Sequence, residues 1–155
     1  MRTNLTKIND LPDKVRAIMN NQILAGLRNV REAALKYAQS SHGFKNRTFN
    51  LEDSYGAGIY LNGRLIEKTL SSPKATKPIV RNGVSYDGHA AADNFLNTYQ
   101  SGDGYTLVVV AGMFYATWVE NIHGLDVLTG SYETALEQMK LVWKEIRTYY
   151  NEPKP

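Results

Sequence analysis

The sequence predicts an α+β fold in which a small antiparallel sheet packs against a long N-terminal helix and a C-terminal helix. Three observations support this prediction. Apolar residues recur every three or four positions in two long segments, an Asn-Gly pair separates two short runs with a spacing of two, and one further run is rich in valine. With 155 residues, 43% of them apolar, we expect a single domain over residues 1–155 built around one core.

The N-terminal helix is expected from Pro12 to about Ser40. Asn9 or Asp10 can cap its first turn, and Gly43 can end it in the left-handed conformation. At 1.5 Å per residue, such a helix runs to about 42 Å, which exceeds the diameter expected for a domain of this size. We therefore expect part of it to overhang the domain or to meet a neighbour. One apolar stripe carries Leu11, Val15, Ile18, Met19, Ile23, Leu27, Val30, Ala34 and Tyr37.

Residues 54–70 predict a β-hairpin, because Asn62-Gly63 lies between two strand-like runs and suits the positive φ angles of a type I′ turn. Residues 71–88 contain a second Asn-Gly pair and two prolines, which indicates a loop or a short protruding hairpin. An Ala-rich helix is expected at residues 89–100. Its apolar face would carry Ala92, Phe95, Leu96 and Tyr99.

The run YTLVVVAG at residues 105–112 is nearly continuous in apolar residues, so we expect it to be the central strand, covered on both faces. A C-terminal helix follows, with Ser131 as its N-cap and Glu133 near the positive end of its dipole. The two long helices are expected to cover one face of the sheet. The stripe of the C-terminal helix carries Ala135, Leu136, Met139, Val142, Trp143, Ile146 and Tyr150.

Composition excludes several classes of protein. The net charge of +3 is a small excess on a mixed surface, unlike the dense basic stripe of a dedicated nucleic-acid binder. The absence of cysteine excludes disulfides and Cys-based zinc sites. The polar N-terminus lacks the apolar core of a secretory signal, and the longest apolar stretch, 105–119, is too short to cross a bilayer. We expect synthesis in the cytoplasm, no membrane span and no cofactor.

Two short patterns in residues 46–63 invite a functional interpretation. The glycines of YGAGIYLNG resemble a phosphate loop, but no GK[ST] sequence follows them and the flanking pattern is that of a strand. We interpret them as positions of strand curvature, close backbone approach or a turn. Glu52 and Asp53 are adjacent, so in an extended chain they would face opposite sides and cannot cooperate as acid and base. A solvated pair of charges is the expected arrangement.

A metal site is the main alternative to a structural role. His89 and Asp93 are four residues apart on the predicted middle helix, with Asp87 just ahead, and Glu120, His123 and Asp126 form a second loose set. Neither spacing matches a known metal motif. The alternative function is therefore a small metal- or ligand-binding protein, or a metal-assisted enzyme, that uses His89, Asp93, Glu120 and His123.

Basic and aromatic residues suggest partner surfaces. Four cations lie in or beside the 71–88 segment, and Tyr86 could stack on a base, although a solvated loop explains the same charges without nucleic acid. Tyr149 and Tyr150 lie in a charged C-terminal segment, where they would suit either an interface or ordinary edge packing. The four cations are Lys68, Lys74, Lys77 and Arg81.

Two segments resemble a known family. Residues 48–54, TFNLEDS, follow the long helix and resemble the Thr-Gly-x-Leu-x-x-Ser segment of the tail-completion, or head-tail joining, proteins of tailed bacteriophages and prophages. Residues 108–120, VVVAGMFYATWVE, are similar to the second hallmark of that family, a Val-rich strand followed by aromatic-Ala-x-x-Val-Glu. The residues that match these motifs or support their packing are Thr48, Asn50, Leu51, Ser54, Tyr115, Ala116, Val119 and Glu120.

The chain also departs from the family pattern. Phe49 stands where the family usually has glycine, Asn121-Ile122-His123-Gly124 replaces Phe-Gly-Thr, and Val127-Leu128-Thr129-Gly130 replaces a Pro-rich approach to the last helix. Relative to the family, residues 71–103 resemble an insertion of a loop and a helix.

The resemblance implies a non-enzymatic virion protein that completes the head-tail junction or the tail end as a ring of identical subunits. Its partners would be other head and tail proteins, and its final location the virion. A ring needs contacts between two different patches of neighbouring copies. We expect Leu51 to fill the core while Thr48, Asn50 and Ser54 bind backbone groups. Candidate interface residues are Asn62, Gly63, Lys74, Lys77, Arg81, Tyr149 and Tyr150.

Overall fold

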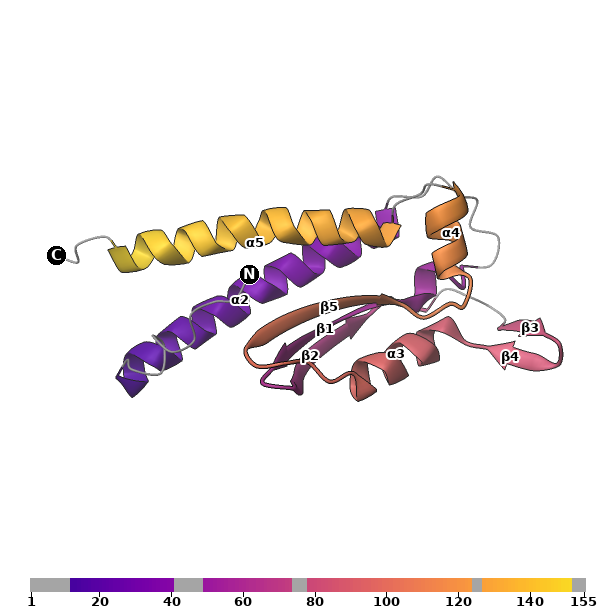
Figure 1. Ribbon diagram of the computed structural model, residues 1–155, viewed down its shortest axis with the longest axis horizontal. Coiled ribbons are helices and arrows are strands. Elements are labelled where there is room, and N and C mark those ends of the chain that lie inside the picture. The colour runs from indigo at the N-terminus through magenta and orange to yellow at the C-terminus, as the bar shows by residue number, and fades with distance from the viewer. Residues whose placement is uncertain (1–11, 41–48, 74–77, 124–126, 152–155) are drawn as a thin grey trace.

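The computed structural model describes residues 12–40, 49–73, 78–123 and 127–151. It confirms an α+β fold with a three-stranded antiparallel sheet, a separate two-stranded hairpin and two long helices (Figure 1). The elements are α2 (Asp13–Ser40), the 3₁₀ turn η1 (Glu52–Ser54), β1 (Tyr55–Leu61), β2 (Arg64–Leu70), β3 (Ile79–Arg81), β4 (Val84–Tyr86), α3 (Gly88–Thr98), β5 (Tyr105–Ala111), α4 (Ala116–His123) and α5 (Val127–Asn151).

The two long helices form an antiparallel pair (Figure 1). They cross closely at Gly26 of α2, where a Cβ atom would lie 2.2 Å from Cγ1 of Val142. The prediction that Ser131 caps α5 is wrong, because the helix begins four residues earlier at Val127. Ser131 is instead buried between the helices, where its hydroxyl donates to the carbonyl oxygens of Val127 (2.8 Å) and Ala34 (3.1 Å).

The first ten residues of α2 include no buried residue, and the buried face of the helix begins at Ile23. Met19 nevertheless packs against the core cluster that contains Ile23, so any overhang is limited to the start of the helix. In Figure 1 this end of α2 diverges from α5. Of the predicted stripe, Ile23, Leu27, Val30 and Ala34 are buried, whereas Ile18 is exposed. The predicted caps at residues 9, 10 and 43 lie outside the described residues.

Strand order corrects one prediction. The sheet runs β2-β1-β5, so β1 is the central strand and the Val-rich β5 is an edge. Six of the seven residues of β1 are buried, whereas every residue of β5 is half-buried. The apolar run of β5 has a different cause. Tyr105, Leu107, Val109 and Ala111 pack on the α2 and α5 side, and α3 lies against the opposite face.

The two faces of β1 carry different residues. Tyr55, Ala57 and Ile59 face the two long helices, as predicted for one face of the sheet. Gly56 and Tyr60 face α3, which covers the other face and was not expected there. A Cβ atom on Gly56 would lie 3.2 Å from Cδ1 of Leu96, so the glycine permits close approach of α3, as the sequence interpretation held.

The middle helix buries a narrower face than predicted. Ala92 and Leu96 are buried against the sheet, but Phe95 and Tyr99 are partly exposed. A hydrogen bond anchors the helix, since the Tyr60 hydroxyl donates to the Leu96 carbonyl at 2.7 Å. Asp87 caps its N-terminus by accepting from the backbone N–H of Ala90. In α5, Leu136 is likewise exposed although the sequence placed it on the buried stripe.

Both Asn-Gly pairs form hairpin turns. Asn62 and Gly63 have φ angles of 50° and 83°, and Asn82 and Gly83 have 52° and 75°. Positive φ at both central residues is the signature of a type I′ turn. The second pair joins β3 to β4. For residues 71–88 the sequence allowed either a loop or a short protruding hairpin, and the described part of this segment contains the hairpin.

A charged cluster joins α2 to the outer strand β2. Glu67 accepts hydrogen bonds from Arg28 and, at 3.2 Å, from Nη1 of Arg31. The hydrogen bond from Arg28, together with the charges of both arginines, lowers the pKa of Glu67. Glu67 in turn raises the pKa of Arg28. Sequence patterns did not indicate this contact, because the partners are separated by more than 30 residues.

The Glu67 cluster predicts a pH-dependent contribution to stability. A carboxyl group with a lowered folded pKa stabilises the fold above its unfolded pKa, and this contribution is lost as pH falls through the folded value. Glu67→Gln should therefore be less stable than the wild type at about pH 7, and this difference should be smaller at about pH 3, below the unfolded pKa of a glutamate. Urea unfolding at both pH values measures the difference. Glu32→Gln, at an exposed position of α2, is the matched control, and a Glu67→Gln deficit that is undiminished at acid pH would contradict the assignment.

Candidate assembly interface

The two motif segments meet in one cluster of the core. Leu51, from the first segment, is 4% exposed and belongs to the same buried cluster as Ala116 and Val119 from the second. Tyr115 packs against this cluster. The Ser54 hydroxyl donates to the Leu51 carbonyl at 2.7 Å, and the Ser54 backbone N–H donates to the same oxygen at 3.0 Å. Segments about 60 residues apart in sequence thus form one structural joint, with the predicted roles of Leu51 and Ser54.

The remaining motif residues are described less completely. Asn50 is buried at the start of the joint. Thr48 lies outside the described residues, and Glu120 is described only as part of the backbone of α4. The predicted contact of Thr48 with backbone groups therefore stays a prediction.

The expected solvated pair at Glu52 and Asp53 is wrong. These residues are 8% and 3% exposed. The expectation assumed an extended chain, whereas the residues form the turn η1, in which the Asp53 N–H donates to the Phe49 carbonyl at 2.9 Å. A short apolar-acidic-acidic-Ser pattern carries no signal that would distinguish such a turn from an exposed loop. Glu52 also lines a small polar cleft together with Lys36, Gln39, Ser40, Ser71 and Ser72.

Phe49 adopts a backbone conformation that favours glycine. Its φ angle is +57°, in the left-handed region, where a side chain costs about 1–2 kcal/mol. Glycine adopts this conformation without that cost, and the resembled family usually has glycine at this position. The aromatic side chain is 40% exposed.

Phe49→Gly is expected to be more stable than Phe49→Ala by about 1 kcal/mol. Both variants remove the ring, but only glycine relieves the strain at positive φ, and its greater freedom in the unfolded chain offsets part of that gain. Urea unfolding of the two variants measures the difference. An alanine variant that is as stable as the glycine variant would contradict a strained φ at this position.

The alternative metal set is not assembled by the described residues. His89 and Asp93 lie one turn apart on α3, but the Asp93 carboxylate is ion-paired with Lys68 and accepts from Nδ2 of Asn97 at 3.1 Å. The Lys68 contact is the main cause of a lowered Asp93 pKa. Glu120 and His123 come from α4, and their side chains lie outside the description. In the part of the chain that is described, no three His, Cys, Asp or Glu residues are placed to hold a metal ion.

The predicted cationic segment is partly occupied by internal contacts. Lys68 donates to the Asn97 side chain at 2.8 Å in addition to its contact with Asp93. The Arg81 guanidinium lies 5.6 Å from the centre of the Phe114 ring. Lys74 and Lys77 lie outside the described residues. The structure therefore brings no cluster of free cations together for nucleic acid within the residues that it describes.

Three tyrosines are buried or half-buried. Burial raises the pKa of Tyr60, Tyr105 and Tyr115, so their hydroxyls stay neutral at physiological pH. Tyr60 is fully buried, and Tyr105 and Tyr115 pack against the core clusters, so all three contribute to packing.

The predicted hairpin-tip residues have a structural role. Asn62 exchanges hydrogen bonds with Gly104, because its backbone N–H donates to the Gly104 carbonyl and its Oδ1 accepts the Gly104 N–H. Gly63 lies against the loop at Ser101. These contacts tie the tip of the β1–β2 hairpin to the start of β5. An interface role for Asn62 and Gly63 stays a prediction.

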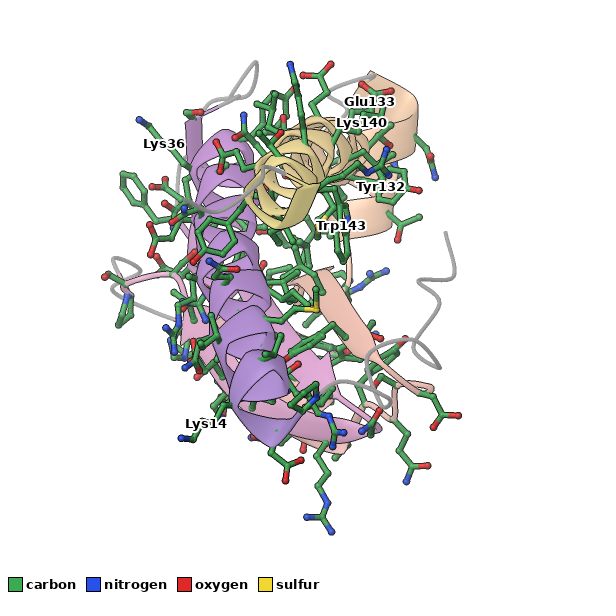
Figure 2. The ribbon with its side chains drawn as sticks, turned by 90° about the vertical axis from the view of Figure 1, so that its left-hand side faces the viewer. Lys14, Lys36, Tyr132, Glu133, Lys140 and Trp143 are labelled. Atoms are coloured by element: carbon green, nitrogen blue, oxygen red, sulfur yellow. The ribbon has the colours of Figure 1, made fainter. Side chains whose placement is uncertain are left out.

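Exposed apolar side chains lie in separate regions of the surface. The ring centres of Phe114, between β5 and α4, and Tyr86, in β4, are 4.6 Å apart. Along α5, Tyr132 is 62% exposed on the side that faces away from α2, whereas Trp143 is half-buried and packs against the core cluster that contains Ile23 (Figure 2). Tyr149, from the predicted interface set, is exposed, whereas the side chain of Tyr150 is not described. A shallow cleft of about 520 Å³ is lined by Leu141, Lys144, Glu145, Thr148 and Tyr149.

This distribution suits contacts between different patches of neighbouring copies, because exposed aromatic and aliphatic side chains occur at sites far apart on one chain. Among the described helices, none is long and apolar enough to span a membrane. Comparisons of the chain with protein-family models, with curated proteins and with solved structures find no match.

Proposed function

We propose that this protein is a non-enzymatic structural component of a tailed bacteriophage or prophage virion, acting at the head-tail junction or at the tail end. The observation that supports the proposal most is the joint in which Leu51 packs in one cluster with Ala116 and Val119. The resemblance depends on these two segments. Because they pack in one buried cluster, the residues that match the family motifs share one structural role.

The proposed mechanism is assembly through protein contacts. A closed ring of identical copies requires two different complementary patches on each copy. The chain carries exposed apolar residues on the α4 end, along α5 and on the β3–β4 hairpin, and none of the first ten residues of α2 is buried. Other head and tail proteins would be the partners of the ring. The protein would be made in the cytoplasm of the host bacterium and would then enter the virion, without a cofactor.

Gene disruption in a phage or prophage that carries this gene tests the proposal. We expect electron micrographs of the lysate to show filled heads and separate tails, or tails of abnormal length, with joined virions restored by the wild-type gene. Normal infectious particles in the absence of the gene would overturn the proposal. Genes for portal, capsid and tail-tube proteins beside this one would be an independent observation in its favour.

A further inference from the structure

The outer edge of β5 offers unpaired backbone groups. Hydrogen bonds at both ends of the β1–β5 ladder, Gly112 N–H to Ser54 O and Asn62 N–H to Gly104 O, fix which residues pair with β1. Because paired residues alternate in an antiparallel ladder, Thr106, Val108 and Val110 pair with β1. The N–H and C=O groups of Tyr105, Leu107, Val109 and Ala111 therefore point outward, and no strand within the described residues pairs with them.

This edge lacks the features that normally prevent association. Native edge strands are protected by charged residues, proline or bulges. The opposite edge, β2, carries Arg64, Glu67 and Lys68, and its pairing with β1 contains a register shift. β5 carries no charge and no proline, and its register with β1 is unbroken over all seven residues. An edge of this kind can pair with a further strand, and no strand among the described residues does so.

The β3–β4 hairpin has the complementary features. It is a two-stranded sheet of three residues per strand, which is marginal on its own. Arg81 and Val84 flank the two-residue turn and form a hydrogen-bonded pair, and Ile79 and Tyr86 form the next such pair. The backbone groups of Val80 and Ser85, which lie between these pairs, therefore point outward. Val80 is 66% exposed and Val84 is 52% exposed. In Figure 1 the hairpin lies at one end of the molecule, beyond α3 and outside the sheet.

Charge separates the two surfaces along the sequence. Residues 68–81 contain four Lys or Arg residues and no Asp or Glu. Residues 82–139, which include β5, α4 and the first half of α5, contain no Lys or Arg. The acidic residues of that segment are Asp87, Asp93, Asp103, Glu120, Asp126, Glu133 and Glu137. The hairpin itself, residues 79–86, carries one cation, Arg81, and no acidic residue, so the acidic residues of a neighbouring copy's segment 87–139 attract it at low salt.

We infer that the β3–β4 hairpin of one copy adds to the open edge of β5 of a second copy and extends its sheet. Backbone hydrogen bonds would provide the affinity and the exposed valines the apolar contact, as in other strand-addition complexes. The contact is heterologous, so each copy offers a hairpin to one neighbour and an edge to another. The inference rests on the proposed function for its choice of a second copy of this chain as the partner.

Substitutions on the hairpin test the contact without touching the core. Val80→Asp/Val84→Asp removes the apolar contact and opposes the charge attraction, so it should weaken self-association at least about tenfold, measured by light scattering over a wide concentration range at low salt. Ile66→Asp on β2, also at an exposed apolar strand position, is the matched control and should leave association unchanged. Urea unfolding establishes that both variants are folded. A folded hairpin variant that associates like the wild type, or a wild type that stays monomeric up to about 1 mM, would overturn the inference.

Cross-linking identifies the partner surface. The photoreactive residue benzoylphenylalanine at position 80, in a mixture of isotopically heavy and light protein, should give heavy-light cross-links to residues 105–111, located by mass spectrometry. Cross-links confined to one copy, or between copies at residues 1–11 or at α5, would overturn the inference. Such results would leave the proposed function standing, because gene disruption tests that function separately. Normal virions after gene disruption, combined with the expected cross-links, would instead overturn the function and retain the contact.

Discussion

Replacing Leu51 by alanine is expected to lower the free energy of unfolding by about 2–5 kcal/mol. The side chain is nearly inaccessible to solvent and belongs to the cluster that joins α2, β1 and the start of α4. Removing its branched end deletes apolar contacts and leaves a cavity, because neighbours from several elements cannot all move inward. Both helical and strand segments meet at this point, so we expect the loss toward the upper part of the range.

Urea unfolding followed by circular dichroism measures the Leu51 effect, and the slope of the transition shows whether the unfolded state has changed. Leu141→Ala is the matched control, because Leu141 is 53% exposed on α5 and should change stability by less than about 0.5 kcal/mol. A Leu51→Ala loss as small as that of the control would remove Leu51 from the core. It would also withdraw the observation that most supports a phage structural role.

Local sequence signals located most of the helices and turns correctly. Periodicity identified α2, and the two Asn-Gly pairs identified the hairpin turns, because both depend on neighbouring residues alone. Strand order was not accessible in the same way. A continuous apolar run means that both faces of a strand are covered, and β5 satisfies this at an edge, where helices lie on both sides. Only long-range pairing distinguishes that edge from a central strand.

The candidate site was predictable where residue type alone decides the outcome. Leu51 is apolar and buried, and Ser54 binds a backbone carbonyl three residues earlier, which is a local contact. Glu52 and Asp53 were placed wrongly, because charged residues are rarely buried and the turn that buries them has no distinctive sequence pattern. The open edge of β5 could not be found from sequence, since it follows from strand order.

Replacing Gly112 by alanine is expected to lower the free energy of unfolding by about 3 kcal/mol or more. A Cβ atom at this position would lie 2.1 Å from the carbonyl oxygen of Gly88 and 2.5 Å from the backbone nitrogen of Ala92. Both atoms belong to the backbone of α3, so a rotamer change cannot relieve the overlap. Either α3 moves away from the sheet or β5 loses the hydrogen bond that Gly112 donates to Ser54.

Gly102→Ala separates this steric effect from the general effect of removing a glycine. Gly102 lies in the loop before β5, where no atom lies within 4 Å of an added Cβ, so alanine there should be neutral or slightly stabilising. Urea unfolding of the two variants gives the comparison directly. If Gly112→Ala is as stable as Gly102→Ala, α3 does not press on the end of β5. The position of α3 would then be wrong, and so would the orientation of the β3–β4 hairpin, which directly precedes α3 in the chain.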